Sequence, residues 1–367
     1  MACHQDAAPE IRQTLSSFPI FRYARYLDNK TNRLPGDRYY GFISHSIRQL
    51  KALWPLLNQQ TQYDLVFSPT VMLHHLLAWW VLMTFHPKKP RHLTLFFVTN
   101  PGIWNPQSKT ATFPKSAFLL GSLLKLFRRQ VEQGKVTLAV ETGGAQQEFE
   151  ALAHMPFTLM PHPVPNSATN SVIFASTQPL NFACYGFARY EKGSDLLKSA
   201  IKVVLAKQPD FSSNFSLQWI DPFMLPNGSS CHINDLQLHP KVTVIDRPLM
   251  PIAYQQLLDQ TSCMILPYRN SSYYARVSRV AIESAYRGIP IIYTKGGWLE
   301  EVVLEFGVGI GIKDESVENL VEAINQMNIN YSSFRQQAME KRTQAQQYFS
   351  SQNFCQQLLR DSFMTVR

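Results

Sequence analysis

The sequence predicts an α/β protein with two doubly wound, Rossmann-like domains that face a cleft. Short apolar strands alternate with helical segments, which is typical of a parallel sheet covered by helices. The alternation stops at residues 161–180, where Pro, Ser, Thr and Asn are frequent, and then begins again. The chain has 367 residues, 45% hydrophobic and 17% charged, which suits two domains that each bury a core.

The first half contains four expected strands connected by helices. Each strand is a short apolar run that ends in turn residues. The helices are an apolar one, an amphipathic one that is closed by Gly134, and a shorter third one. We expect strands at residues 63–69, 92–99, 135–142 and 157–165, and helices at 71–85, 115–134 and 145–153.

The second half repeats the pattern and ends in a long helical tail, residues 317–363. We expect an N-terminal, acceptor-side domain over residues 1–160, a linker over 161–180 and a C-terminal domain over 181–345. The last helix, within residues 346–367, is expected to pack back on the N-terminal domain. The strands are expected at residues 181–187, 215–221, 242–248, 262–268 and 289–294, with a helix at 194–208.

The positive charge is concentrated in the first half of the chain. Of the formal net charge of +9, residues 1–165 contribute 17 Lys and Arg against 9 Asp and Glu. Residues 166–367 contribute 18 against 17. A basic half favours an anionic partner such as a phosphorylated substrate or an acidic lipid. Nucleic acid is not expected, because no recognition helix or aromatic-basic motif accompanies the charge.

Several classes of protein have no motif in this sequence. The five cysteines are scattered without a CxxC pair, which suits free thiols in a reducing compartment and disfavours a zinc site. HExxH, GxSxG and P-loop patterns do not occur. The longest apolar run, residues 76–85, is shorter than the roughly 20 residues that span a bilayer. We therefore expect a cytoplasmic protein without a metal ion or other cofactor.

The first candidate site is the stretch YGFARYEKGSDLLKSAI, residues 185–201. A strand ends near Gly186, and a loop with Arg189 and Lys192 leads through Gly193 into a helix. Cations at the start of a helix suit a phosphate, because they add charge to the free backbone amides there. An exposed basic turn before a Ser N-cap explains the pattern equally well.

The second candidate site is the stretch RVSRVAIESAYRGIP, residues 276–290. Arg276 and Ser278 precede a helix whose amides could hold a phosphate, and Glu283 lies one turn inside it. The neighbours of Glu283 are apolar, so the helix is expected to be buried and its carboxylate to have a partner, such as a ribose diol. A solvated glutamate is the alternative.

The third candidate site is the paired glycines Gly296 and Gly297, which follow an apolar strand. Glycines there permit a positive φ or the close approach of a ligand to the backbone. Trp298 is expected to be a packing residue rather than a stacking platform. The GVGIGI stretch at residues 307–312 is not taken as a dinucleotide fingerprint, because its spacing is wrong and it does not open a helix.

These motifs, in this order, resemble the donor-binding half of GT-B fold glycosyltransferases, most closely the large retaining family four. That family has G-x-x-R-x-x-K-G after a strand, then E-A/S-x-x-x-G-x-P on a helix, then a Gly-Gly loop followed by acidic residues. The resemblance covers residues 155–350 by motif and 60–155 by topology. The matching positions are Gly186, Arg189, Lys192, Gly193, Glu283, Ser284, Gly288, Pro290, Gly296, Gly297, Glu300 and Glu301.

The resemblance implies a metal-independent hexosyltransferase that uses a nucleotide sugar. Arg189 and Lys192 would bind the diphosphate and stabilise the leaving group as its charge develops. Glu283 would bind the ribose, and Ser278 with Arg276 would contact the distal phosphate. The loop around residues 248–254 would lie near the base.

The sequence departs from the family pattern at three places. A glutamate that usually contacts the donor sugar is replaced by Ala275. The first-domain loop that often holds a histidine reads VTNPGIW, with Thr99 and Asn100 instead. The N-terminus resembles the turn after a second strand, so a first strand-helix unit is expected to be missing.

The resemblance implies transfer of a sugar from a nucleotide-sugar donor, with retention, to a glycan or lipid-linked acceptor in polysaccharide biosynthesis. The amphipathic helix at residues 115–134 carries Lys115, Lys125, Arg128 and Arg129, which suits peripheral binding to the inner face of an anionic membrane. An ordinary surface helix is the alternative. Two other functions remain open: a non-catalytic GT-B protein that binds a nucleotide sugar or acts as a scaffold, and a sugar-nucleotide epimerase.

Overall fold

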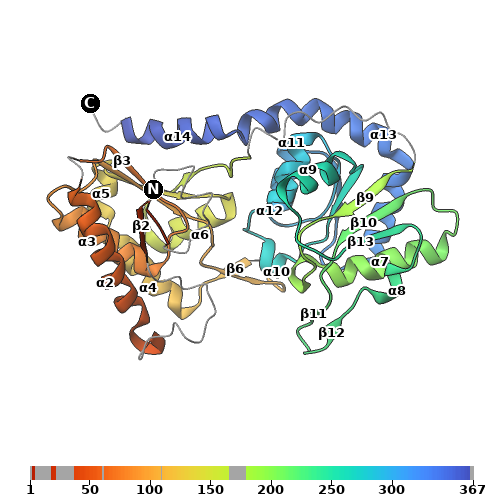
Figure 1. The fold of residues 1–367 in the computed structure, drawn as a ribbon, viewed down its shortest axis with the longest axis horizontal. Coiled ribbons are helices and arrows are strands. Elements are labelled where there is room, and N and C mark those ends of the chain that lie inside the picture. The colour runs from red at the N-terminus through yellow and green to blue at the C-terminus, as the bar shows by residue number, and fades with distance from the viewer. Residues whose placement is uncertain are drawn as a thin grey trace.

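The computed structural model describes residues 2–4, 18–21, 37–59, 62–108, 110–164 and 179–363. Two α/β bodies lie side by side, and the C-terminal helices run across both of them (Figure 1). The expected linker, residues 161–180, falls largely on residues 165–178, which lie outside the described residues. Within the described residues, no helix is both long and apolar enough to cross a membrane.

The N-terminal body is built on a four-stranded parallel sheet in the order β3-β4-β7-β8. Its central strand β4 is buried along its whole length, because helices cover both of its faces. The strands are β3 (Leu65–Ser68), β4 (His92–Phe97), β7 (Val136–Val140) and β8 (Thr158–Leu159), and a separate pair is formed by β1 (Ala2–His4) and β2 (Phe18–Phe21). The helices are α2 (Asp37–Asn58), α3 (Leu73–Phe85), α4 (Lys115–Lys125), α5 (Arg128–Glu132) and α6 (Gly143–Ala153).

Two details of the N-terminal body differ from the sequence-based expectations. The residues after β4 form an antiparallel hairpin, β5 (Ile103–Asn105) and β6 (Thr110–Thr112), where a plain loop was expected. The Asn105 side chain starts its turn by accepting the N–H of Gln107 at 2.9 Å. The helix expected at residues 115–134 is broken into α4 and α5 at Phe127, whose ring is fully buried.

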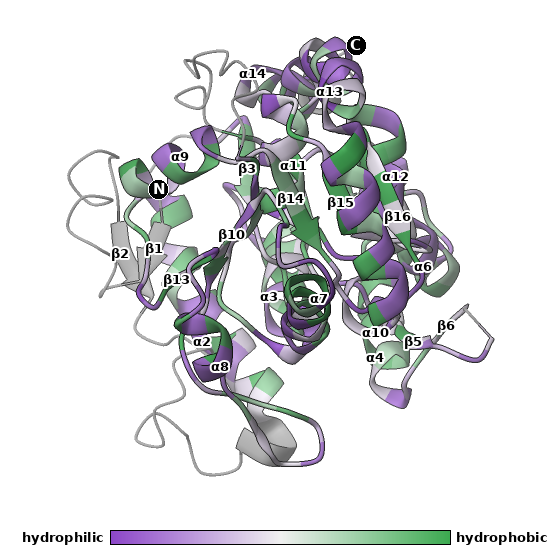
Figure 2. Cartoon of the chain, turned by 90° about the vertical axis from the view of Figure 1, so that its right-hand side faces the viewer, coloured by the Kyte–Doolittle hydropathy of each residue, from purple (hydrophilic) through white to green (hydrophobic). Residues whose placement is uncertain are grey.

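The C-terminal body contains a six-stranded parallel sheet in the order β13-β10-β9-β14-β15-β16. Strand β14 is fully buried and appears as a hydrophobic arrow between covering helices in Figure 2. The strands are β9 (Asn181–Cys184), β10 (Asn214–Gln218), β13 (Val242–Ile245), β14 (Cys263–Leu266), β15 (Ile291–Thr294) and β16 (Gly309–Ile312). The helices are η3 (Tyr190–Lys192), α7 (Ser194–Lys207), α8 (Asn234–Gln237), α9 (Pro251–Asp259), α10 (Asn270–Tyr273), α11 (Arg279–Arg287) and α12 (Trp298–Phe306).

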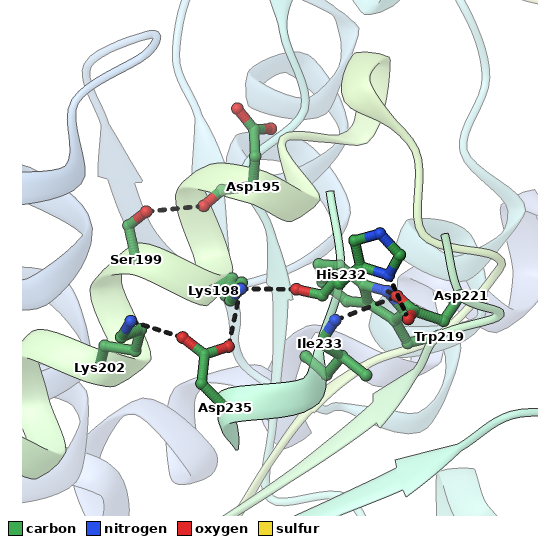
Figure 3. A network of polar contacts seen from close by, with 9 residues as sticks. All are labelled: Asp195, Lys198, Ser199, Lys202, Trp219, Asp221, His232, Ile233 and Asp235. Atoms are coloured by element: carbon green, nitrogen blue, oxygen red, sulfur yellow. Dashed lines mark hydrogen bonds and ion pairs between the residues drawn. The ribbon is translucent and has the colours of Figure 1, made fainter. Parts of the chain in front are cut away.

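A short excursion follows β10 and was not expected from the sequence. It contains the hairpin of β11 (Phe223–Met224) and β12 (Ser230–Cys231). Figure 3 shows how it is fixed: the Asp221 carboxylate accepts bonds from Trp219 Nε1, the Ile233 N–H and His232. Asp235 pairs with two lysines of α7, Lys198 at 2.7 Å and Lys202 at 2.5 Å. This polar cluster holds the excursion against α7.

The helical tail bends at Asn330 and ends in a separate last helix. Helix α13 (Val317–Tyr348) covers the C-terminal sheet, and α14 (Ser351–Phe363) reaches the N-terminal body (Figure 1). The break occurs at Phe349, which is buried and whose carbonyl accepts the N–H of Val164 at 2.8 Å. The ring of Phe354 then packs on Phe67 and Phe96, with centroids 5.7 and 6.1 Å away.

Candidate functional site

The predicted site residues other than Glu283, which lies on α11, are found in three loops at one edge of the C-terminal sheet. Strands β9, β14 and β15 are neighbours and parallel, so their carboxyl ends meet at the same edge. We call the segments that follow them the first loop (residues 185–193), the second loop (267–278) and the third loop (295–297). Arg189 and Lys192 lie in the first, Arg276 and Ser278 in the second, and Gly296 and Gly297 in the third.

The first loop brings Gly186 and Lys192 into direct contact. Gly186 has a φ of +89°, and the Lys192 ammonium occupies the space that a Cβ at Gly186 would need. The Gly186 N–H donates to Gln218 Oε1 at 2.7 Å, which fixes the start of the loop to the end of β10. Burial lowers the pKa of Lys192 below its ordinary value, because it destabilises the charged form of the side chain. An anion bound at this ammonium would stabilise the charged form.

Arg189 is held by its backbone and keeps an exposed guanidinium. Its N–H donates to Ser194 Oγ at 3.0 Å, and its guanidinium lies 3.5 Å from Glu191. Gly193 then turns the chain into α7 with a φ of +64°, and the carbonyl of Pro267 leaves no room for a side chain there. The half-exposed guanidinium of Arg189 is therefore available to an anion beside Lys192.

Arg269 connects the first and second loops, and the sequence analysis did not single it out. Its buried guanidinium forms a bidentate pair with Asp195, both bonds 2.8 Å long, and lies 2.7 Å from Glu315. The Arg269 N–H donates to the carbonyl of Glu191 at 3.0 Å. An arginine shortly after an apolar strand was the only signal in the sequence, because its partners lie 46 and 74 residues away.

Helix α11 begins where the sequence predicted. Ser278 is buried and caps the helix by accepting the N–H of Ala281 at 3.4 Å. Arg276 precedes the cap and is exposed, with its guanidinium 5.7 Å from the Tyr273 ring centroid. The helix ends at Gly288, which has a φ of +65°.

Glu283 is buried and both of its carboxylate oxygens already have protein partners. Its exposed fraction is 1%, so the alternative of a solvated glutamate is wrong. The Tyr254 hydroxyl donates to Oε2 at 2.6 Å, and Arg279 Nε donates to Oε1 at 3.0 Å. The Arg279 side chain is half exposed, so its displacement would open Glu283 to a ligand. The ribose-binding role of Glu283 stays a prediction.

The third loop is joined to the second by an amide. Asn270 Nδ2 donates to the carbonyl of Lys295 at 2.6 Å. Gly296 has a φ of +88°, and its N–H donates to Glu300 Oε2 at 2.8 Å. A Cβ at Gly297 would lie 2.8 Å from Asn270 Oδ1 and from the Cα of Tyr274. Trp298 is buried, which confirms that it is a packing residue.

The comparisons with known proteins agree with this arrangement. Residues 173–346 match the family model described as glycosyl transferases group 1. Residues 173–346 thus form a domain that is similar to the group 1 glycosyltransferases. No curated protein sequence matches the chain.

Solved structures of GT-B proteins resemble the whole chain at low sequence identity. Sucrose-phosphate synthase from Thermosynechococcus elongatus is 17% identical, with a TM-score of 0.58 over 92% of this chain and 82% of that one. HepE from Anabaena, in complex with UDP and glucose, is 15% identical, with a TM-score of 0.56 over 89% and 83%. A glycosyltransferase from Rickettsia africae is 12% identical, with a TM-score of 0.62 over 91% and 84%. The chain therefore has the GT-B fold, as the sequence predicted.

The C-terminal body contacts the N-terminal body through its second loop. Thr142, the N-cap of α6, donates its hydroxyl to the carbonyl of Ala275 at 2.8 Å. A Cβ at Gly144 would lie 3.1 Å from the Cβ of Ala275. The position where the family usually has a sugar-binding glutamate is thus packed against the other domain, which explains why a small residue stands there.

No cluster of His, Cys, Asp and Glu suited to a metal ion occurs in the part of the chain that the structure describes. His74 and His75 lie on α3 within the N-terminal body. Burial lowers the pKa of His75 to about 4, so this side chain is neutral near pH 7. His75 accepts the N–H of Met72 at 3.1 Å, which gives it a structural role.

Proposed function

We propose that the protein transfers a sugar from a nucleotide-sugar donor to a glycan or lipid-linked acceptor, with retention at the anomeric carbon. The observation that supports this proposal is that the Lys192 ammonium lies against Gly186, at the carboxyl end of β9, where a side chain at Gly186 would otherwise be. There the half-buried ammonium of Lys192 and the exposed guanidinium of Arg189 are available to one diphosphate. The glycosyltransferase class follows from the family match, and the donor class is supported by HepE, which was solved with UDP and with UDP-glucose.

The chemistry assigned to these residues is stabilisation of the leaving group. Transfer breaks the bond between the anomeric carbon and the diphosphate oxygen, and negative charge develops on that diphosphate. Lys192 and Arg189 would neutralise this charge, an effect that is strongest in the transition state. Because these side chains supply the positive charge, the proposal requires no metal ion. Ser278 and Arg276 would contact the distal phosphate at the start of α11.

The acceptor side is assigned to the basic N-terminal body, which we place at the inner, cytoplasmic face of a membrane. Helix α4 exposes Phe118, with an exposed fraction of 62%, and Leu119 beside Lys115 and Lys125. Exposed apolar and cationic side chains on one helix suit an anionic lipid surface. A lipid-linked acceptor would be reached from that surface.

One observation favours a second candidate, a non-catalytic GT-B protein that binds a nucleotide or acts as a scaffold. Glu283 is closed off by Tyr254 and Arg279, and Ala275 replaces the usual sugar-binding glutamate. A protein that binds nucleotide but transfers no sugar would show this combination.

Calorimetric titration with UDP, GDP, ADP and dTDP tests the donor site. We expect saturable binding of one of them, and at least tenfold weaker binding by Lys192→Ala, because a hydrogen bond to a charged group contributes about 1.5–3 kcal/mol. Lys202→Ala is the matched control: it removes a lysine of α7 that pairs with Asp235 outside the three loops. Failure of the folded wild-type chain to bind any of the four would overturn the proposal. Binding without sugar transfer to any acceptor would favour the second candidate.

A further inference from the structure

Tyr274 lies at the point where the second loop, the third loop and the N-terminal body meet. Its carbonyl accepts the N–H of Trp298 at 2.8 Å, so its backbone holds the end of the third loop. Gly297 approaches it so closely that a side chain there would collide with its Cα. Arg276 and Ser278 follow it by two and four residues. A displacement of Tyr274 would therefore move both loops.

The side chain of Tyr274 is bound entirely by residues of the N-terminal body. Its hydroxyl donates to Glu148 Oε1 at 2.6 Å and accepts from Asn100 Nδ2 at 2.6 Å. Its ring stacks on Trp104 of β5, with centroids 4.9 Å apart and planes inclined by 29°. In Figure 1 the β5–β6 hairpin extends from the N-terminal body to α10, and β5 contacts that helix.

Glu148 is built into the N-terminal body as a fixed acceptor for this hydroxyl. It is buried on α6, and its second oxygen accepts the N–H of Gly102 at 2.7 Å and Asn100 Nδ2 at 3.2 Å. A buried carboxylate requires such partners. Burial and the neighbouring Glu148 both raise the pKa of Tyr274, so its hydroxyl stays protonated and remains a donor. The short bond is therefore a charge-assisted one.

We propose that Tyr274 is a positioning residue: its contact with Glu148, Asn100 and Trp104 sets the second and third loops and couples donor binding to the contact between the two domains. The inference rests on the proposed donor site and deepens it. It assigns a function to the β5–β6 hairpin and to Asn100, which lies in the loop where the resembling family often has a histidine. Tyr274 does not touch the diphosphate in this assignment; it acts through Arg276, Ser278 and the Gly296–Gly297 backbone.

The test is a double-mutant cycle with Tyr274→Phe, Glu148→Gln and the double variant. Tyr274→Phe keeps the ring on Trp104 and removes only the hydroxyl. We expect each single variant to weaken nucleoside diphosphate binding about tenfold in titrations with UDP, GDP, ADP and dTDP. The double variant should lose no more than Tyr274→Phe alone, about tenfold rather than a hundredfold, because Glu148→Gln weakens the same bond that Tyr274→Phe removes. Tyr348→Phe, on α13, is the matched control and should bind as wild type.

Hydrogen–deuterium exchange separates positioning from loss of fold. In Tyr274→Phe, exchange should rise in residues 270–278 and 295–298 and stay unchanged in β9 and β14. Wild-type affinity in Tyr274→Phe and Glu148→Gln would overturn the inference and leave the proposed function standing. Additive losses in the double variant would also overturn it. Absence of binding by the wild-type chain would overturn the proposed function and, with it, this inference. If Glu148→Gln does not fold, Asn100→Ala replaces it in the cycle, because it removes the bond that Asn100 Nδ2 donates to the same hydroxyl.

Discussion

At the scale of the residue, the first loop depends on a glycine whose missing side chain makes room for a cation. The Lys192 ammonium lies where a Cβ at Gly186 would be, and the φ of Gly186 is +89°. Gly228 offers a comparison, since its φ is +82° but nothing lies within 4 Å of its Cβ position. The two glycines thus share a backbone constraint, and of the two only Gly186 has a lysine where its Cβ would lie.

Gly186→Ala and Gly228→Ala separate the two effects. Each should cost about 1–2 kcal/mol of unfolding free energy, because a side chain at positive φ is strained. Only Gly186→Ala should also weaken nucleoside diphosphate binding, by about tenfold or more, because the new Cβ displaces Lys192. Urea denaturation and calorimetric titration of both variants measure this. Equal affinity in the two variants would show that Lys192 is not held by Gly186.

At the scale of the element, helix α3 contains a histidine that makes the N-terminal body sensitive to acid. Burial lowers the pKa of His75 to about 4, whereas an exposed histidine titrates near 6.5. Between these values the unfolded chain binds a proton that the folded chain does not, so folding stability falls as pH drops from 6.5 to 4. Below about pH 4 both states are protonated and this contribution no longer changes.

His75→Asn should remove this part of the pH dependence. The asparagine Oδ1 can accept the Met72 N–H as Nδ1 does, but it does not titrate. We expect the wild-type chain to lose about 2–3 kcal/mol more than the variant between pH 7 and pH 4, from the size of the shift. Urea denaturation at both pH values measures the difference. The same loss in both proteins would contradict the assignment to His75.

The sequence predicted the elements of the C-terminal body well, because each signal is local. The Ser278 cap, the apolar face after it and Gly288 lie within eleven residues and define α11 without reference to the rest of the chain. The β5–β6 hairpin was missed because its strands are three residues each, too short for a clear alternation of polar and apolar residues. The GVGIGI stretch forms edge strand β16, where the Ile291 carbonyl excludes a side chain at Gly309.

At the scale of the whole molecule, α14 joins the end of the chain to the N-terminal body. Phe354 packs on Phe67 of β3 and Phe96 of β4, two strands of the N-terminal sheet. Together with the contact between Tyr274 and Glu148, this attaches both the end of the chain and the second loop to the N-terminal body.

Phe354→Ala should release α14 while leaving the three loops in place. A half-buried phenylalanine contributes about 1–3 kcal/mol, so exchange in residues 351–363 should rise severalfold. Nucleoside diphosphate affinity should change less than twofold, because Phe354 packs on Phe67 and Phe96, which lie on strands of the N-terminal sheet and not in the three loops. Hydrogen–deuterium exchange and calorimetric titration measure these two quantities. A large loss of affinity would indicate that α14 sets the domain contact as well.

The sequence by itself determined the fold class, the three loops and the residue types in them, because strands, helix caps and glycine turns depend on neighbours within about ten positions. Only the tertiary structure decided how these loops are held. Arg269 finds Asp195 and Glu315, Glu283 finds Tyr254, and Tyr274 finds Glu148, across 29 to 126 residues of chain. No fixed spacing in the sequence predicts such polar partners, because they depend on which strand ends lie side by side in the fold. A buried charge requires a partner, and the fold determines which residue is close enough to be that partner.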